Sequence, residues 1–522
     1  MSGIAVDASP LCFRLAKFVG DLTGWRRTVF SFLAGGLSAA ALPPVHAVPV
    51  LLLVFPCLLW LIDSCPTWRR AFMDGWWFGF GHFLAGLYWI GFSLLVDAAQ
   101  FAWLLPFAVL CIPAVLAIYI GLVTVITRAA SPGPLRVIAF AASWILIEWL
   151  RALLFTGFPW NGIGTVWAFS DTMMQFAAVG GVYGLGLLTV FIAASPATLA
   201  YGKERAVWVI PVIAGVLAAG LWTYGAARLP VGSAQFHDGV VLRVVQPNIP
   251  QRLKWQPELR DQHLATYLRL SSQPADTPPT HIIWPETAVP FFLGSDPTRR
   301  QAVASIIPDN GLLLTGAIRR SPRGPHPFQV WNSFFGIDST GDIVATYDKF
   351  HLVPFGEYVP FRGLLGFAKI TQGRTDFSAG PGPRTLPLPG LPPASPLICY
   401  EVIFPDQVTA PGAPPRWLLN VTNDAWFGTS SGPYQHLAMA RFRAVEQGIP
   451  LVRAANTGIS VVTDSYGREL ARVDLNKRGI LTMGLPRFAE ASTYFSQFGS
   501  GPTIYLSVFL LLGVYLRKFM VR

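Results

Sequence analysis

The chain has 522 residues, 52% of them hydrophobic and 13% charged. Soluble globular domains carry about 25% charged residues, so this composition is typical of an integral membrane protein and excludes an ordinary soluble one. The net charge is +11, but the basic residues cluster beside apolar runs rather than in a stripe through the polar region. We therefore expect a membrane protein of two or three domains with no nucleic-acid partner.

Apolar runs of the length that spans a bilayer, about 20 residues, fill most of the first 230 residues and recur near the C-terminus. They predict about eight spans with loose boundaries, because Pro and Gly interrupt several runs. The predicted spans are residues 28–44, 47–63, 74–96, 101–126, 137–155, 172–200, 206–226 and 503–517. Gly75–Gly79 and Gly180–Gly184 have the GxxxG spacing that brings helices close together.

This pattern divides the chain into three regions. We expect a helical bundle of seven spans over residues 1–230, a polar domain over 236–490 and a C-terminal transmembrane helix over 500–522. Lys and Arg are concentrated in alternate loops, which the positive-inside rule assigns to the cytoplasm together with both chain ends. These residues are Arg69, Arg70, Arg128, Arg136, Lys203, Arg205, Arg517, Lys518 and Arg522. The polar domain is then expected on the opposite side of the membrane.

Strand-like and helix-like runs alternate in the polar domain, which predicts layers of sheet and helix. The predicted strands are residues 240–245, 281–284, 312–317, 334–337, 343–347, 397–399, 417–419, 451–454 and 459–463, and the predicted helices are 257–272, 297–308 and 433–448. The segment 381–396 is rich in Pro and Gly, so we expect it to be a surface loop.

Three reactive side chains stand at the ends of predicted strands. Glu286 and Lys349 each follow a strand, and Cys399 ends one. Catalytic sites in layered sheets gather at the carboxyl ends of strands, so this shared position favours a joint site. Taken alone, Cys399 has two interpretations, an inert buried thiol or a nucleophile. The polar domain has no second Cys for a disulfide and no CxxC motif for a metal.

Two histidines of the polar domain, His351 and His436, offer a further alternative. Either would give Cys399 a histidine partner like that of papain-type proteases. Glu286 supplies a base without them, so we expect His436 to satisfy a local hydrogen bond instead.

Longer motifs carry a resemblance to a known family. They are Gln246–Gln251 (QPNIPQ), Trp284–Ala288 (WPETA), Tyr347–Tyr358 (YDKFHLVPFGEY), Cys399–Glu401 (CYE), Asn423–Gly428 (NDAWFG), Gln435–Arg441 (QHLAMAR) and Asn456–Ile459 (NTGI), with Gly157–Trp160 (GFPW) in the membrane region. Their order and spacing resemble the apolipoprotein N-acyltransferases, membrane-embedded members of the nitrilase superfamily, over nearly the whole chain. The resemblance implies a membrane α-helical bundle of about eight spans plus an α/β nitrilase-like domain, a four-layer α-β-β-α sandwich. It also implies the inner membrane of a bacterium, with that domain in the periplasm.

The same resemblance implies a catalytic triad of Glu286, Lys349 and Cys399. It implies supporting carboxylates at Glu357 and Glu401. The residues that it implies for the substrate site are Trp255, Asn332, Tyr400, Trp426 and Phe427. It implies neither a metal nor a cofactor. The expected protein is a monomer whose partners are a phospholipid acyl donor, a diacylglyceryl-modified apolipoprotein acceptor and the bilayer.

A Cys, a Glu and a Lys together suit acyl transfer in two halves. The thiolate would attack a phospholipid ester and leave a thioester, which the α-amino group of the acceptor's N-terminal diacylglyceryl-cysteine would then attack. Glu286 is expected to move protons, and Lys349 to stabilise negative charge. We also expect apolar residues within 355–375 to form a lid that keeps water from the thioester. These lid residues are Phe355, Phe361, Leu364, Leu365 and Phe367.

Two other functions fit parts of this pattern. A membrane-tethered nitrilase-type amidase that hydrolyses a small carbon–nitrogen bond would use the same triad, but it would have little need of the long membrane region. A transporter or scaffold with a degenerate polar domain would need no triad at all, so the complete set of reactive residues disfavours it.

Overall fold

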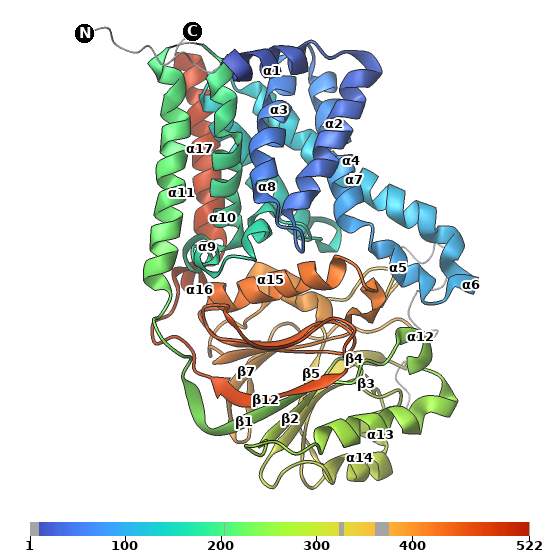
Figure 1. The fold of residues 1–522 in the computed structure, drawn as a ribbon. Coiled ribbons are helices and arrows are strands. Elements are labelled where there is room, and N and C mark those ends of the chain that lie inside the picture. Colours follow the sequence, from blue (N-terminus) through green and yellow to red (C-terminus); the bar gives the residue numbers. More distant parts are fainter. Residues whose placement is uncertain (1–9, 203, 323–327, 361–374, 521–522) are drawn as a thin grey trace. The chain divides into compact units, whose positions relative to one another are not determined.

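The structure is a computed structural model that describes residues 10–202, 204–322, 328–360 and 375–520. The chain divides into two compact units (Figure 1). The first unit comprises Met1–Tyr88, Leu104–Pro230 and Tyr494–Arg522, and the second comprises Trp89–Trp103 and Val231–Thr493. Residues 89–103, which the sequence assigns partly to spans, therefore cluster with the polar region.

The first unit is built of helices. They are α1 (Pro10–Gly20), α2 (Gly24–Ser38), α3 (Leu51–Asp63), α4 (Trp68–Leu87), α7 (Leu105–Ala129), α8 (Leu135–Leu153), α9 (Asp171–Met174), α10 (Ala177–Ala194), α11 (Val209–Arg228), α16 (Tyr494–Phe498) and α17 (Gly501–Met520). Short 3-10 helices join them at η1 (Ala39–Ala41), η2 (Val48–Val50), η4 (Leu154–Thr156), η5 (Ile163–Trp167), η6 (Ser195–Ala200) and η7 (Arg205–Trp208). A further 3-10 helix, η3 (Ala102–Leu104), connects the segment 89–103 of the second unit to α7.

Four helical stretches of the described chain are long and apolar enough to cross a membrane. They are Ala98–Ala129, Leu135–Thr156, Ala177–Ala200 and Arg205–Arg228, and the helices Val48–Asp63 and Gly501–Arg517 are apolar but shorter. Two predicted spans coincide with helices that do not meet these criteria. Helix α2, at the predicted span 28–44, has only 15 residues. Helix α4, at the predicted span 74–96, contains the polar residues Arg70, Asp74 and His82, which reduce its apolar character. Eight spans thus remain a prediction.

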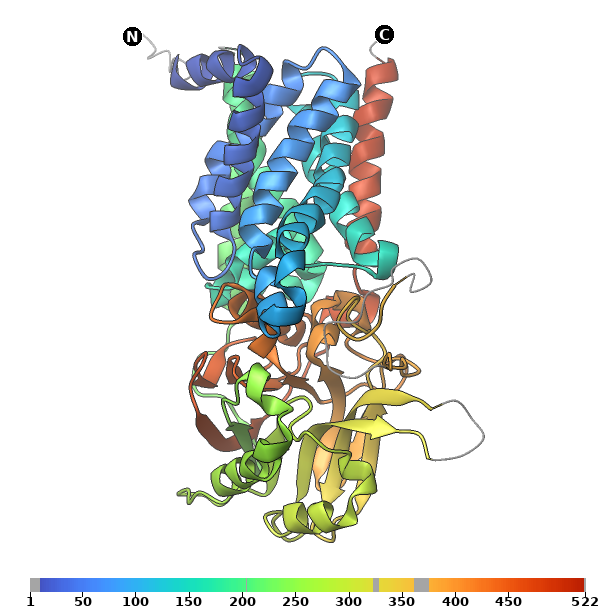
Figure 2. The same ribbon diagram turned by 90° about the vertical axis from the view of Figure 1, so that its right-hand side faces the viewer.

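Close helix contact in the first unit depends on small residues. Helices α4 and α7 lie side by side (Figures 1 and 2). A Cβ added to Gly75 would lie 2.2 Å from Thr124 Oγ1, and one added to Gly79 would lie 2.9 Å from Ile120 Cβ. The GxxxG spacing therefore predicted this contact correctly, since larger side chains would force the two helices apart.

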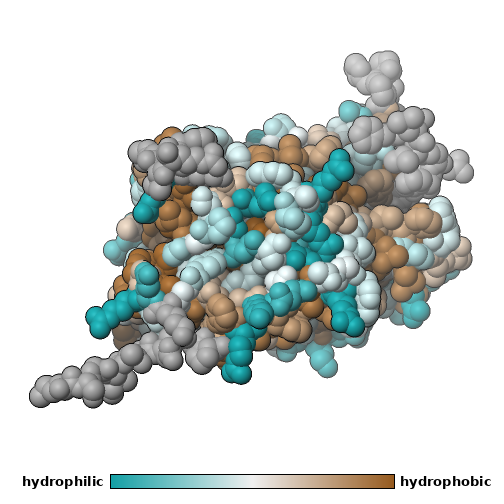
Figure 3. All heavy atoms as spheres, turned by 90° about the horizontal axis from the view of Figure 1, so that it is seen from above, coloured by the Kyte–Doolittle hydropathy of each residue, from teal (hydrophilic) through white to brown (hydrophobic). Residues whose placement is uncertain are grey.

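Basic side chains bind backbone carbonyls at the end of the first unit where α3 ends and α4 begins. Arg128 Nη2 donates to the carbonyls of Cys65 (3.1 Å) and Pro66 (3.0 Å), and Arg136 pairs with Asp63. Figure 3 looks onto this end and shows hydrophilic side chains among apolar ones. Two of the basic residues used for the predicted orientation, Lys203 and Arg522, lie outside the described residues.

The second unit contains two sheets. Their strands are β1 (Phe236–Gln246), β2 (His281–Trp284), β3 (Leu312–Arg320), β4 (Val330–Asp338), β5 (Ile343–Asp348), β6 (Leu386–Leu388), β7 (Leu391–Ile398), β8 (Trp417–Thr422), β9 (Leu451–Ala455), β10 (Ser460–Thr463), β11 (Glu469–Val473) and β12 (Gly479–Pro486). The helices of this unit are α5 (Ile90–Leu95), α6 (Ala98–Phe101), α12 (Gln251–Lys254), α13 (Arg260–Ser271), α14 (Pro297–Ala304) and α15 (Gly432–Gln447). Its 3-10 helices are η8 (Pro257–Leu259), η9 (Leu293–Ser295), η10 (Cys399–Ile403), η11 (Pro405–Gln407) and η12 (Asp424–Phe427).

Each sheet has six strands with a parallel centre. The first has the order β12-β1-β2-β3-β4-β5, and the second has the order β11-β10-β9-β8-β7-β6. Strands β1, β2 and β3 run parallel to one another, as do β7, β8 and β9. The outer strands pair antiparallel.

The packing gives four layers. Residues such as Val244, Leu314 and Phe334 of the first sheet and Leu419 and Val452 of the second form one core between the two sheets. The outer face of the first sheet is covered by α13 and α14 in a second core (Figure 1). Helix α15 packs through a smaller cluster on the other face of the second sheet. This is an α-β-β-α arrangement.

The prediction of a surface loop over 381–396 is wrong. Strand β6 and most of β7 lie there, paired antiparallel. The turn signal itself is real, because Gly390 has φ +74° between the two strands. The flanking Leu386, Leu388 and Ala394 are buried between the sheets, and this burial outweighs the Pro and Gly content of the segment.

Candidate active site

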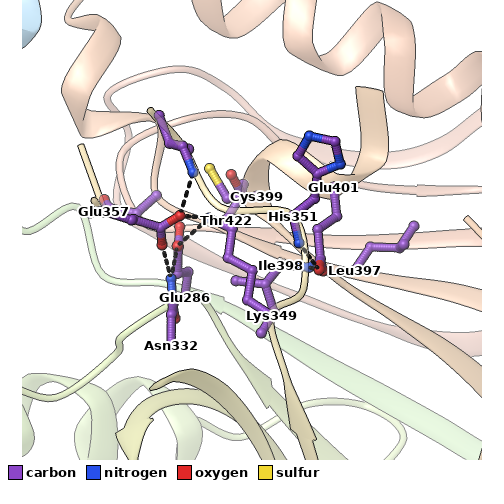
Figure 4. A network of polar contacts seen from close by, with 12 residues as sticks. Glu286, Asn332, Lys349, His351, Glu357, Leu397, Ile398, Cys399, Glu401 and Thr422 are labelled. Carbon is purple, nitrogen blue, oxygen red and sulfur yellow. Dashed lines mark hydrogen bonds and ion pairs between the residues drawn. The ribbon is translucent and has the colours of Figure 1, made fainter. Parts of the chain in front are cut away.

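The three reactive residues follow strands of both sheets in the second unit. Glu286 comes two residues after β2, Lys349 directly after β5 and Cys399 directly after β7. Their side chains are almost fully buried, with exposed fractions of 7%, 1% and 7% for the three residues. Figure 4 shows them in one group with Asn332, Glu357 and Thr422.

Cys399 lies on a sharp turn between β7 and η10. Its φ of +51° is in the left-handed region, which non-glycine residues rarely adopt. Two contacts hold the turn: Glu401 Oε2 accepts from Ile398 N at 2.7 Å, and His436 Nε2 lies 3.2 Å from the Cys399 carbonyl oxygen. Strain of this kind persists only when the surroundings impose it, and it is found at functional sites.

Lys349 lies between two carboxylates. Its Nζ is 2.9 Å from Glu357 Oε2 and 3.8 Å from Glu286 Oε1. Asn332 Nδ2 donates to both, at 2.7 Å to Glu286 and 2.9 Å to Glu357. The backbone N–H of Val353 also donates to Glu357. The two carboxylates thus share the Lys349 ammonium and the Asn332 amide as donors, and these shared donors offset their mutual repulsion.

The position of Glu286 depends on a glycine in the neighbouring strand β3. A Cβ on Gly316 would lie 2.5 Å from Glu286 Cα and 2.7 Å from Thr287 N. The backbone N–H of Gly316 donates to the Pro285 carbonyl, and Ala288 N donates to the Gly316 carbonyl. The glycine therefore lets the turn that carries Glu286 lie against β3, where any other residue would collide with backbone.

Burial and neighbouring charges set the protonation states of the thiol and the ammonium. Burial raises the pKa of the Cys399 thiol and Glu286 raises it further, while Lys349 opposes the rise. Burial alone would lower the pKa of Lys349, but Glu357, Glu286 and Cys399 raise it above its ordinary value. At neutral pH the resting site therefore holds a thiol and an ammonium, and the thiol requires a base before it can attack.

The second predicted supporting carboxylate, Glu401, has a different surrounding. It accepts hydrogen bonds from Tyr347 Oη (3.0 Å), Phe350 N (2.8 Å) and Ile398 N. Burial raises the pKa of Glu401 to about 7, although its N–H donors and Lys349 oppose the rise. Glu401 thus connects the turn of Cys399 with the chain that follows Lys349.

The aromatic candidates differ in their placement. Tyr400 is buried next to the nucleophile, with its ring 5.7 Å from His351 and 5.2 Å from Phe404. The Phe427 ring in η12 is 4.5 Å from Trp89. Trp255 and Trp426 are half-buried, and their place in the substrate site stays a prediction.

The predicted lid falls mostly outside the described residues. Only Phe355 among its five members is described, and it is exposed, with φ +61°. The other four, Phe361, Leu364, Leu365 and Phe367, lie outside the described residues. Within the described chain, no three His, Cys, Asp or Glu side chains lie close enough together to hold a metal ion.

Comparison with known proteins covers both units. The model of the apolipoprotein N-acyltransferase N-terminal domain matches residues 34–195, and that of the carbon-nitrogen hydrolases matches residues 242–492. The apolipoprotein N-acyltransferase of Rhodopseudomonas palustris is 44% identical over 97% of this chain and 98% of its own length. This chain belongs to the apolipoprotein N-acyltransferase family.

Further proteins are similar to the chain. The apolipoprotein N-acyltransferase of Bradyrhizobium diazoefficiens is 42% identical over 92% of this chain and 93% of its own length. Among solved structures, an amidase from Nesterenkonia sp. is 20% identical, and the match covers 53% of this chain and 100% of that chain with a TM-score of 0.35. The match to the carbon-nitrogen hydrolase model, together with the two sheets, confirms the nitrilase fold that the family resemblance predicted for the second unit.

Sequence reasoning missed a polar network behind the nucleophile. Asp424 pairs with Arg453 at 2.7 Å and lies 2.8 Å from His436 Nδ1, and all three side chains are buried. Thr422 Oγ1 donates to Asp424 Oδ1 at 3.0 Å, and the Thr422 side chain opposes the rise in the pKa of the Cys399 thiol. The predicted local hydrogen bond of His436 is confirmed, and it involves the backbone carbonyl of Cys399.

A second missed residue is Lys254, whose side chain is buried and donates from Nζ to the Glu286 carbonyl oxygen at 3.2 Å. A single lysine in a short polar segment is normally a surface charge, so the sequence held no signal for its burial. The motif Asn423–Gly428, in contrast, contains Asp424 and marked its neighbourhood.

Proposed function

We propose that this chain transfers a fatty acyl group from a phospholipid to the α-amino group of the N-terminal diacylglyceryl-cysteine of an apolipoprotein, through a thioester on Cys399. Family membership over nearly its full length supports an N-acyltransferase. The observation that carries the mechanism is that Cys399 lies in one buried group with Glu286 and Lys349 (Figure 4). Such a site supplies a nucleophile, a base and a cation in one place.

In the first half-reaction, Glu286 accepts the thiol proton while Cys399 Sγ bonds to the carbonyl carbon of the phospholipid ester. The carbonyl oxygen becomes negatively charged, and the Lys349 ammonium stabilises it; one such donor contributes about 3 kcal/mol. The carbon–oxygen ester bond then breaks. Glu286 returns the proton to the departing oxygen, so the lysophospholipid leaves as an alcohol and the acyl chain stays on sulfur.

In the second half-reaction, the neutral α-amino group of the apolipoprotein attacks the thioester carbon. Glu286 takes one proton from the attacking nitrogen, and that proton restores the Cys399 thiol as the carbon–sulfur bond breaks. The products are an amide on the acceptor and a free enzyme. Because each half needs Glu286 first as a base and then as an acid, its ion pair with Lys349 has to remain weak.

We propose that the membrane region has eight spans, seven over residues 1–230 and one over 500–522. We also propose that residues 236–490 form a catalytic domain that faces the periplasm. The four long apolar helices and the family fit a bacterial inner-membrane protein. The basic residues at the end where α3 ends and α4 begins support a cytoplasmic position for that end. A monomer remains our proposal for the oligomeric state.

Hydrolysis of a small amide by a membrane-tethered amidase is not favoured, because full-length relatives are named as acyltransferases. The test uses the purified full chain in detergent micelles with a phospholipid and a synthetic diacylglyceryl lipopeptide. We expect the lipopeptide to gain one acyl chain when its α-amine is free and none when that amine is acetylated. Cys399→Ala should abolish the transfer. Ammonia release from small amides without any lipopeptide acylation would contradict the proposal.

A further inference from the structure

Lys254 is a buried lysine next to the site that the mechanism above does not use. It ends the short helix α12, and only 2% of it is exposed. Its Nζ donates to the backbone carbonyl of Glu286 at 3.2 Å, and this is its one hydrogen bond within the described chain. A buried ammonium is expensive unless other charges compensate for it, so the compensating groups indicate what Lys254 does.

Two reactive groups can provide that compensation. Glu286 favours the charged form of Lys254, and Cys399 does so once its thiol has become a thiolate. Glu286 follows β2 of the first sheet, and Cys399 follows β7 of the second. Of the other titratable groups near α12, His263 of α13 contacts the carbonyl of Leu253, and Arg252 of α12 is exposed.

Lys254 adds a second ammonium to a group in which Lys349 is already paired. Lys349 Nζ lies 2.9 Å from Glu357 Oε2 and 3.8 Å from Glu286 Oε1, so two carboxylates share its charge. A thiolate at Cys399 would attract the Lys254 ammonium as well, and an opposite charge nearby favours the ionised form of a thiol.

We propose that Lys254 is a positioning residue for the acyl transfer, an inference that rests on the proposed function. Its Nζ binds the backbone carbonyl of Glu286 and so holds the turn that carries this residue. Its positive charge, together with that of Lys349, favours the thiolate of Cys399. It need not contact the substrate. The loop that bears Glu286 is therefore fixed from two sides, by the Gly316 backbone and by the Lys254 ammonium.

This role predicts that the rate of thioester formation depends on pH. Burial lowers the pKa of Lys254 to about 8, against the opposing effect of Glu286 and Cys399. Below that pH the ammonium favours the thiolate, and above it the charge is lost. The rate of thioester formation should therefore fall as the pH rises beyond 8. The acylation half-reaction contains no acceptor amine, so titration of the lipopeptide cannot imitate this fall.

The experiment measures single-turnover thioester formation from a phospholipid between pH 6 and 10. Wild type is compared with Lys254→Met, Lys254→Arg and the matched control Arg252→Met, which removes an exposed charge from the same helix. At pH 7, Lys254→Met should be slower by about 10-fold to 100-fold, with the phospholipid concentration at half-maximal rate nearly unchanged. Lys254→Arg should keep its rate above pH 8, since guanidinium does not titrate there, and Arg252→Met should match wild type.

Three results would overturn the inference. The first is a wild-type rate that does not fall above pH 8. The second is a folded Lys254→Met enzyme with the wild-type rate and pH profile. The third is a Lys254→Arg enzyme that keeps the alkaline fall. If wild type itself forms no thioester, the proposed function fails instead, so the two failures are distinguishable.

Discussion

Lys349 pairs more closely with Glu357 than with Glu286: the Nζ–Oε distances are 2.9 Å and 3.8 Å. Glu357 therefore takes up most of the lysine charge. Glu286 keeps a hydrogen bond from Asn332 at 2.7 Å but no tight ion pair with Lys349, so it stays able to receive a proton. The two carboxylates have different tasks because the lysine is placed unequally between them.

Glu357→Gln tests this division of tasks. The substitution removes the charge that holds Lys349, so we expect Lys349 to move toward Glu286 and to weaken it as a base. Thioester formation should slow by about 100-fold, within the range for general acid–base catalysis. Rapid-quench kinetics with a labelled phospholipid would measure it. The control is Glu258→Gln at an exposed position of η8; equal rates for both variants would contradict the assignment.

Gly316→Ala tests the placement of Glu286. The new Cβ would lie 2.5 Å from Glu286 Cα, so the turn has to shift. We expect a loss of about 1–3 kcal/mol in stability from overpacking and a larger loss of acylation rate. Thermal unfolding and kinetics of the same preparation separate the two effects. Gly294→Ala is the matched control, since its Cβ would meet only ordinary contacts at 3.5 Å or more. An active Gly316→Ala enzyme would argue against a fixed turn.

His436→Gln distinguishes a glutamate base from a histidine base. The His436 ring faces Asp424 and the backbone carbonyl of Cys399, and Gln retains a donor for that carbonyl. We expect acylation to stay within about 10-fold of wild type, whereas Glu286→Gln should lose at least about 100-fold. A papain-like Cys–His pair would give the reverse order. Thioester yield at a fixed time point is sufficient to rank the two variants.

Glu401 predicts a dependence of stability on pH. Its pKa in the folded protein is raised to about 7, above the ordinary value of about 4.3. Between these values the folded state binds the proton more tightly than the unfolded state. The stability from this group is therefore complete below the ordinary pKa and is lost as the pH rises through 7, by about 4 kcal/mol at most.

The measurement for Glu401 is the melting temperature of wild type and Glu401→Gln in detergent at pH 5, 6 and 7.5. The advantage of wild type over the variant should shrink as the pH rises, because Gln does not titrate. A gap that stays constant or widens toward pH 7.5 would show that Glu401 is ionised throughout, with its N–H donors outweighing burial.

The strand ends made part of the site predictable. Glu286, Lys349 and Cys399 could be grouped because each follows an apolar strand, and Asn332 came from the family resemblance. The local pattern could not reveal that Asn332 bridges two carboxylates, because strand β4 places it opposite Ile318 and the carboxylates come from distant segments. The burial of Lys254 could not be predicted for the same reason, because it results from tertiary packing around Glu286.

The fold was predictable where burial follows a simple period. Strand β2 was predicted at its observed bounds, since its four residues are all buried. Strand β6 and the first six residues of β7 were missed because the prolines and the glycine of 381–396 resemble a loop, so only the end of β7, from residue 397, was predicted. Only the facing sheet makes the leucines of this segment part of a core. Strands β11 and β12 were missed because their side chains alternate little between buried and exposed. Strand β11 forms by pairing with β10, and strand β12 forms by pairing with β1.

The proposed reaction passes through a covalent acyl group on the sulfur of Cys399. The direct measurement is mass spectrometry of the purified full chain after incubation with a phospholipid of defined acyl chains, followed by digestion. We predict one acyl group on the peptide that contains Cys399, released by hydroxylamine, lost on addition of a lipopeptide with a free α-amine and absent from Cys399→Ala. An unmodified Cys399 in a preparation that still acylates the lipopeptide would contradict the account.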